Sequence, residues 1–332
     1  GARGRNGALL AVNLASASGL SELAIDGVVS KEADALLSLP GLLNYLGPEN
    51  LQPVLDRAKQ KGIRIRAVNA VDPDTVARTV WTSLLAARRQ GVALGKYGTF
   101  PLTLEETDRV VGEVQRWFGD WSAAPVFFVD HGILTAEKVY TRDFVVDGVK
   151  AWLDVVAKHG VPVVLIDTLD KSAGWKILKD ASTEQKGLLS KGQIQSIDAF
   201  AAQRGIRVLW AGGITLPQVY EFGKMGVFGI YVTSAAAAAV PVGPAYERDP
   251  ALAALKEPTF EGVSRAKLLL EAGFLAEKQR DKQPTKDFDT LAHRFISELA
   301  KGKASNGQRL QELDNELAGK TLDAWKSHPE LT

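Results

Sequence analysis

Acidic and amine side chains stand where apolar stretches of this chain end. In VPVVLIDTLDKSAG, residues 161–174, Asp167 follows the apolar residues directly and Lys171 stands four positions later. A second amine, Lys96, lies in VALGKYG. Burial disfavours the charged form of a lysine, so such an amine can attack a carbonyl carbon or exchange protons with a carboxylate. These residues predict Schiff-base or acid–base chemistry, with a purely structural ion pair as the alternative.

Further polar residues follow apolar stretches in the same way. Asp130 and His131 come after PVFFV, and Asn69 comes after IRIRAV. We expect Asp130 to join the catalytic set named above. The alternative for Asp130 is that its carboxylate only caps a loop.

A glycine pair and a hydroxyl pair predict an anion site. Gly212 and Gly213 lie in WAGGIT, and Thr233 and Ser234 lie in YVTSAAA. Glycines let backbone N–H groups approach an oxyanion, and barrel enzymes often bind phosphate after their seventh and eighth strands. We expect these four residues to bind a phosphate group; the alternative is that the glycines only form a tight turn.

Alternating strands and helices must position these side chains. Glycine follows several of the predicted helices, as it often does at helix ends, and Thr103 with Glu106 matches a capping box at one helix start. Ala235–Ala239 is expected to form a small-residue helical turn. The predicted strands are 8–14, 33–39, 63–69, 91–97, 124–130, 161–167, 206–212 and 228–234.

Eight βα units indicate an α/β fold, a (β/α)8 TIM barrel over residues 1–245. Several strands are continuous apolar stretches, which is typical of parallel strands covered on both faces. A doubly wound open sheet is the structural alternative, but NLASASG lacks the glycine-rich pattern of its first turn. The second strand has an alternative position, because ELAIDG at 22–27 competes with 33–39.

A C-terminal α-helical extension follows the barrel over residues 246–332. Three amphipathic stretches there predict helices, separated in part by the charged linker EKQRDKQPTKD. The helices either pack on the barrel or serve as an oligomerisation arm. We expect a homo-oligomer, or a protein partner bound through residues 258–332.

Composition narrows the possible functions. The formal net charge of +1 gives no general attraction to nucleic acid or to anionic membranes. Cysteine is absent and the four histidines have no metal-ligand spacing, so we expect neither a metal nor a cofactor. No apolar stretch approaches the roughly 20 residues that span a bilayer, and the lack of cysteine suits a reducing compartment, so a cytoplasmic protein is expected.

The segment LIDTLDKSAG…LLS…IQSIDAFAAQRGIRVLWAGGIT resembles the (5-formylfuran-3-yl)methyl phosphate synthases, barrel lyases of methanofuran biosynthesis. LGKYG is similar to the Lys-Val-Gly-Leu-Tyr-Gly segment of that family. The resemblance implies lysine-dependent joining of triose phosphates, with Lys96, Asp167 and Lys171 as matching residues. The chain departs from the family where Leu39 stands in place of the strand-two lysine and where YVTSAAA lacks the strand-eight arginine.

Two functions are therefore expected. The first is a lysine-dependent lyase or synthase acting on a small phosphorylated carbonyl compound, linked to methanofuran or one-carbon cofactor biosynthesis. The second is a non-catalytic barrel that serves as a binding or assembly subunit through its helical tail.

Overall fold

A computed structural model describes the chain in two compact units, one made of residues 1–14, 213–238 and 256–332, and the other of residues 15–212 and 239–255. The described residues are 2–3, 9–12, 73–89, 91–100, 102–119, 123–134, 139–140, 144–169, 173–180, 186–233, 235–239, 256–278, 285–301 and 307–327.

A four-stranded parallel sheet forms the core of the unit that contains Lys96 and Asp167. Its strands are β3 (Gly95–Gly98), β4 (Ala123–Phe128), β7 (Val163–Asp167) and β10 (Arg207–Trp210), and they lie in the sheet in the order of the chain. Doubly wound sheets reverse their strand order at a switch point, whereas successive βα units of a barrel do not. Every residue of β4 and β7 is buried, as expected for parallel strands with both faces covered.

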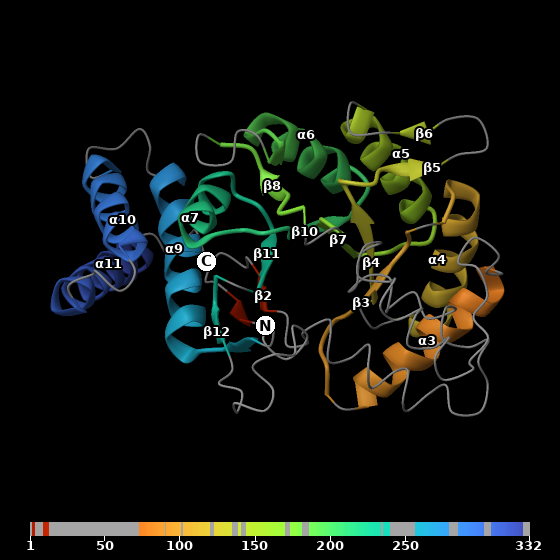
Figure 1. Cartoon of the computed structure of the whole chain (residues 1–332), viewed down its shortest axis with the longest axis horizontal. Helices are drawn as coiled ribbons and strands as arrows, with labels where there is room; N and C mark the ends of the chain where they lie inside the picture. The colour runs from red at the N-terminus through yellow and green to blue at the C-terminus, as the bar shows by residue number, and fades with distance from the viewer. Residues whose placement is uncertain are drawn as a thin grey trace. The chain divides into compact units, whose positions relative to one another are not determined.

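Helices follow the strands of this unit one by one. The first, α3 (Pro73–Arg89), precedes β3, and α4 (Leu104–Phe118), α5 (Val145–Ala157) and α6 (Lys191–Ala202) follow β3, β4 and β7. Each helix packs on the next, and Figure 1 shows α4, α5 and α6 around the strands. The predicted capping box is present, since the Thr103 hydroxyl accepts from the Glu106 N–H and the Glu106 carboxylate accepts from the Thr103 N–H.

Two short ladders lie in the loops that follow the strands. After β4, β5 (Ile133–Leu134) pairs antiparallel with β6 (Val139–Tyr140). After β7, β8 (Lys176–Leu178) pairs parallel with β9 (Gly187–Leu189).

The other unit combines the first strands of the chain with its last helices. Strand β2 (Leu9–Val12) pairs parallel with β11 (Gly229–Val232) and antiparallel with β1 (Ala2–Arg3). Helix α7 (Leu216–Lys224) precedes β11, and the short strand β12 (Ala237–Ala239) pairs with β13 (Lys256–Pro258).

Three C-terminal helices complete this unit: α9 (Phe260–Lys278), α10 (Thr285–Ala300) and α11 (Gly307–Ser327). Helices α7 and α9 cross so closely that a Cβ atom on Gly223 would lie 2.2 Å from the Leu270 carbonyl oxygen. A Cβ atom on Gly273 would lie 2.1 Å from the Tyr220 carbonyl oxygen, so both glycines are required for this contact. In Figure 1, α10 and α11 pack outside α9.

The predicted fold class, an α/β fold of (β/α)8 type with a C-terminal α-helical extension, is confirmed in the part of the chain that the structure describes. Six of the predicted strands are present as parallel strands, β2, β3, β4, β7, β10 and β11. The predicted strands at 33–39 and 63–69, the competing segment at 22–27 and most of the linker lie outside the described residues. The domain boundary between residues 245 and 246 stays a prediction.

The prediction for Ala235–Ala239 is wrong. Residues 235 and 236 form a turn, and Ala237–Ala239 is a strand. The cause is pairing with β13 and a hydrogen bond from the Thr259 N–H to the Ala236 carbonyl, which override the helix propensity of alanine.

None of the helices described is both long and apolar enough to cross a membrane.

Candidate active site

Lys96 and Asp167 lie together in the structure. The Lys96 Nζ atom is 4.0 Å from the Asp167 Oδ2 atom, and the two side chains are only 17% and 8% exposed. The other carboxylate oxygen of Asp167, Oδ1, accepts a hydrogen bond of 2.7 Å from the Thr168 N–H. An amine and a carboxylate thus approach each other in a site largely withdrawn from water.

Sheet register explains how two strands that are not neighbours bring these side chains together. Lys96 is paired with Ala124 of β4, and Phe128 of β4 is paired with Asp167. Ala124 and Phe128 are four residues apart, so their side chains point to the same face of the sheet, because side chains alternate along a strand. Lys96 and Asp167 therefore share that face, and the long lysine side chain reaches toward the carboxyl end where Asp167 lies.

The predicted position of Lys96 within its strand is wrong. Residues 91–97 were expected to form the strand, with Lys96 at its carboxyl end, but β3 begins at Gly95, so Lys96 is its second residue. The next residue, Tyr97, points to the opposite face, because side chains alternate along a strand, and it is 2% exposed there. Burial there raises the pKa of the Tyr97 phenol far above its usual range.

Asp130 joins the loops that follow β4 and β7. Its side chain is 1% exposed, and both carboxylate oxygens accept from the Leu169 N–H, at 2.9 Å and 3.0 Å. The Val129 N–H also donates to the Asp167 carbonyl at 3.0 Å. The turn directly after Asp167 is thus held by the loop after β4, which is the loop-capping role that the sequence left open for Asp130.

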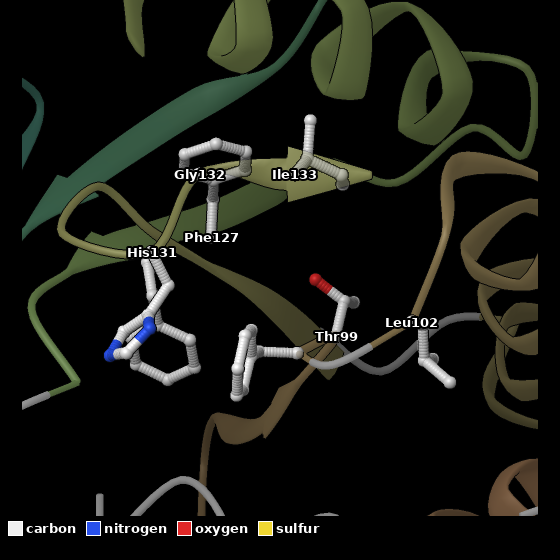
Figure 2. A pocket seen from close by; sticks show the side chains of 8 residues that line it. Thr99, Leu102, Phe127, His131, Gly132 and Ile133 are labelled. Carbon is white, nitrogen blue, oxygen red and sulfur yellow. The ribbon is translucent and has the colours of Figure 1, made fainter. Parts of the chain in front are cut away.

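His131 stands beside Asp130 and lines a small pocket at the carboxyl ends of β3 and β4 (Figure 2). Its Nε2 atom is buried 3.8 Å from Asp130 Oδ2, too far for a hydrogen bond, and no hydrogen-bond partner for it is found among the described residues. The His131 ring packs on Phe100 with 4.8 Å between ring centroids.

This pocket has a volume of about 90 Å³ and mainly apolar walls. The Thr99 hydroxyl at its edge is already engaged, donating to the Val126 carbonyl at 2.9 Å and accepting from Trp152 Nε1 at 3.2 Å. Neither Lys96 nor Asp167 lines the pocket, and its chemistry does not suit a phosphate. The lining residues are Thr99, Phe100, Leu102, Phe127, Phe128, His131, Gly132 and Ile133.

Gly212 has a packing role in the structure. Its φ angle is 107°, and a Cβ atom there would lie 3.0 Å from Thr168 Cγ2 and 3.2 Å from Ile177 Cβ. Its carbonyl accepts from the Ile177 N–H at 2.8 Å, which fixes strand β8 over the end of β10. These contacts fit the tight-turn interpretation of Gly212, and phosphate binding by Gly212 stays a prediction.

The remaining phosphate-site residues belong to the unit that holds the C-terminal helices. Gly213 is exposed, with a φ angle of 65°, and the Thr233 carbonyl accepts from the Ala236 N–H. Phosphate binding by these residues stays a prediction. The predicted site residues Lys171 and Ser234, and the candidate Asn69, lie outside the described residues.

In the unit that contains Lys96 and Asp167, another carboxyl group has a strongly altered pKa. Asp198 of α6 accepts a hydrogen bond of 3.0 Å from Trp210 Nε1 at the end of β10. Burial raises the pKa of Asp198 to about 7, although the Trp210 hydrogen bond acts in the opposite direction. Asp198 lies on the helix-facing side of the sheet, because its partner Trp210 is paired with Ile166, the neighbour of Asp167 that points to the other face.

The described residues contain no group of three or more acidic or histidine side chains that could hold a metal ion.

Comparison with known proteins gives distant structural similarity alone. No protein-family model and no curated protein matches the chain. Its structure is similar to that of a protein described as a phosphonomutase from Burkholderia cenocepacia J2315, with a TM-score of 0.38 and 16% identity, over 70% of this chain and 87% of that one. It is also similar to KGPDC from Streptococcus mutans in complex with D-R5P, with a TM-score of 0.33 and 14% identity, over 82% of this chain and 98% of that one.

A second structure of KGPDC from Streptococcus mutans has a TM-score of 0.32 and 15% identity, over 79% of this chain and 98% of that chain. Similarities of this size carry no argument about activity.

Proposed function

We propose that this chain is an enzyme that uses Lys96 to form a Schiff base with a small phosphorylated aldehyde or ketone. The observation that carries the proposal is the approach of Lys96 Nζ to within 4.0 Å of a carboxylate oxygen of Asp167, with both side chains largely buried. Partly buried amines with a carboxylate beside them are suited to carbonyl chemistry, because the amine must lose a proton before it attacks.

Asp167 supplies a place for that proton. The Lys96 amine attacks the carbonyl carbon, a C–N bond forms, and the carbonyl oxygen leaves as water once it has been protonated. The carboxylate at 4.0 Å carries the two protons of the neutral amine, one after the other, to the departing oxygen, so an amine and a carbonyl give an imine and water and the step needs no oxidant or reductant. The resulting imine makes the neighbouring carbon acidic, which permits aldol or dehydration chemistry.

The resemblance to the (5-formylfuran-3-yl)methyl phosphate synthases directs the choice of substrate. It favours glyceraldehyde 3-phosphate and a role in methanofuran or one-carbon cofactor biosynthesis. Lys171 is proposed as a second acid–base group. The residues proposed to bind the phosphate are Gly212, Gly213, Thr233 and Ser234.

Borohydride trapping tests this function. The protein is incubated with glyceraldehyde 3-phosphate, reduced with sodium borohydride and digested, and the modified lysine is located by mass spectrometry. We expect the adduct on Lys96, its loss in Lys96→Ala and Lys96→Arg, and a yield reduced about tenfold or more in Asp167→Asn. Lys158→Ala is the matched control, since Lys158 is an exposed lysine that pairs with Asp108 on the neighbouring helix.

The outcome also decides between the two expected functions. An adduct spread over surface lysines, or none in the wild-type protein, would contradict the enzyme and favour a non-catalytic binding or assembly subunit. In that case the expected finding is a partner that co-purifies with the full chain and is chemically cross-linked to residues 258–332.

A further inference from the structure

Asp130 was expected among the catalytic residues, but its contacts indicate another role. We infer that Asp130 is a positioning residue, which fixes the turn after β7 and thereby holds the Asp167 carboxylate toward Lys96. The inference rests on the proposed function for its catalytic consequence and on hydrogen bonds alone for its structural one.

The Asp130 carboxylate binds the backbone of the turn after β7. Both carboxylate oxygens accept from one backbone group, the Leu169 N–H, at 2.9 Å and 3.0 Å. The side chain is 1% exposed, so this bond forms where competition from water is weak. A hydrogen bond to a charged acceptor in such a place is stronger than one between neutral groups.

The hydrogen bond from Leu169 to Asp130 holds the turn that directly follows Asp167. Leu169 is two residues after Asp167, and the Thr168 N–H between them donates to Asp167 Oδ1 at 2.7 Å. The Asp167 carbonyl in turn accepts a hydrogen bond from the N–H of Val129, which is the residue before Asp130. The backbone that directly follows the Asp167 side chain is therefore tied to residues 129 and 130, while Oδ2 is the oxygen that approaches Lys96.

Asp130 is itself supported by the packing of its neighbour His131. His131 follows Asp130, packs its ring on Phe100 just beyond β3, and lines the pocket of Figure 2. The loop that carries the Asp130 carboxylate thus packs against the end of β3, the strand that contains Lys96. Asp130 connects the strand of the amine to the turn beside the carboxylate through packed contacts.

Two substitutions at one position distinguish positioning from chemistry. Asp130→Asn keeps an oxygen that accepts from the Leu169 N–H but loses the charge and the basicity. Asp130→Ala loses both. A positioning role requires that Asn preserves most of the function and Ala does not, whereas a proton-transferring carboxylate would be lost equally in both variants.

Hydrogen exchange of the Leu169 amide provides the structural measurement. We expect exchange at least about tenfold faster in Asp130→Ala and close to wild type in Asp130→Asn. Asp147→Ala, which removes an exposed acid from the first turn of α5, is the matched control and should leave the Leu169 amide protected. If Asp130→Ala does not fold, Asp130→Ser, whose short hydroxyl is not expected to replace the carboxylate bond, is measured in its place.

Trapping with glyceraldehyde 3-phosphate provides the functional measurement. The rate of adduct formation on Lys96 should fall at least about fivefold in Asp130→Ala and less than about twofold in Asp130→Asn. An equal fall in both variants, or unchanged Leu169 exchange in Asp130→Ala, would overturn the inference. If the wild-type protein forms no adduct, the proposed function fails, and the exchange experiment still decides whether Asp130 holds the turn.

Discussion

At the scale of single residues, burial gives the carboxyl groups of this chain different tasks. Asp167 lies beside an amine, Asp130 holds a backbone N–H, and Asp198 is buried against an indole with its pKa raised to about 7. Asp198 is the one whose effect on stability can be read from its pKa.

Asp198 makes stability depend on pH in a defined window. Its pKa is about 7 in the folded protein against an ordinary 3.8, so the folded protein keeps a proton that the unfolded chain releases. The free energy of unfolding should therefore fall as the pH rises from about 4 to about 7, and this contribution should be constant above that range. Asp198→Asn keeps an acceptor for Trp210 and cannot ionise.

We expect Asp198→Asn to be more stable than wild type at pH 8, by about 1–3 kcal/mol, and nearly equal to it at pH 4. Urea unfolding at the two pH values measures the difference, with Asp147→Asn as the exposed control. A gain of the same size at both pH values would show that ionisation of Asp198 is not its source.

At the scale of elements, local signals in the sequence predicted helix ends better than strand starts. Glu106 and Thr103 form the predicted capping box, since that motif depends only on residues three apart. Strand β3 starts later than expected because Gly91 and Val92 donate back to the Arg88 and Ala87 carbonyls and so end α3. An apolar residue such as Val92 looks like part of a strand in the sequence, yet it is 42% exposed in that turn.

The crossing of α7 and α9 is the element contact with the strictest steric demand. Gly223→Ala and Gly273→Ala should each destabilise the protein by about 2–4 kcal/mol, because the new methyl group would meet a backbone carbonyl of the facing helix. Denaturant unfolding monitored by circular dichroism gives the value for each variant.

Gly319 provides a matched control, because it lies in α11 with open space around its Cβ position. Gly319→Ala should be neutral or stabilise by up to about 1 kcal/mol, through helix propensity alone. Equal effects at all three positions would mean that propensity, and not the close crossing, decides the result.

At the scale of the whole molecule, the sequence predicted the kind of fold and one central pair of residues. The βα rhythm and the apolar strands identified the α/β class, and the placement of Lys96 near Asp167 followed from parallel strands. The sequence did not show that Asp130 would bond to Leu169 or that Gly212 would pack on Thr168, because those contacts depend on how neighbouring loops meet. Loop-to-loop contacts leave no periodic pattern.

The C-terminal helices behave as part of a folded unit in the structure. Helix α9 packs along α7, and α10 is tied to α7 by a hydrogen bond of 2.5 Å from the Tyr220 hydroxyl to Asp289 and by an ion pair of 3.2 Å from Lys224. Deletion of residues 260–332 would expose the apolar residues of α7 that these helices cover. We expect the shortened chain to be largely insoluble or to lose cooperative unfolding, as measured by expression yield and thermal denaturation; a soluble, cooperatively folding product would favour the oligomerisation arm.

The pairing of β2 with β11 has a consequence for biosynthesis. Leu9 is the neighbour of Gly229 in the sheet, so strand β2 leaves the ribosome some 220 residues before its partner strand. At synthesis rates of about 5–20 residues per second, this delay lasts roughly ten to forty seconds. Throughout that interval an apolar segment lacks its permanent neighbour, and a nascent chain of this kind is a natural client for chaperones that bind near the exit tunnel.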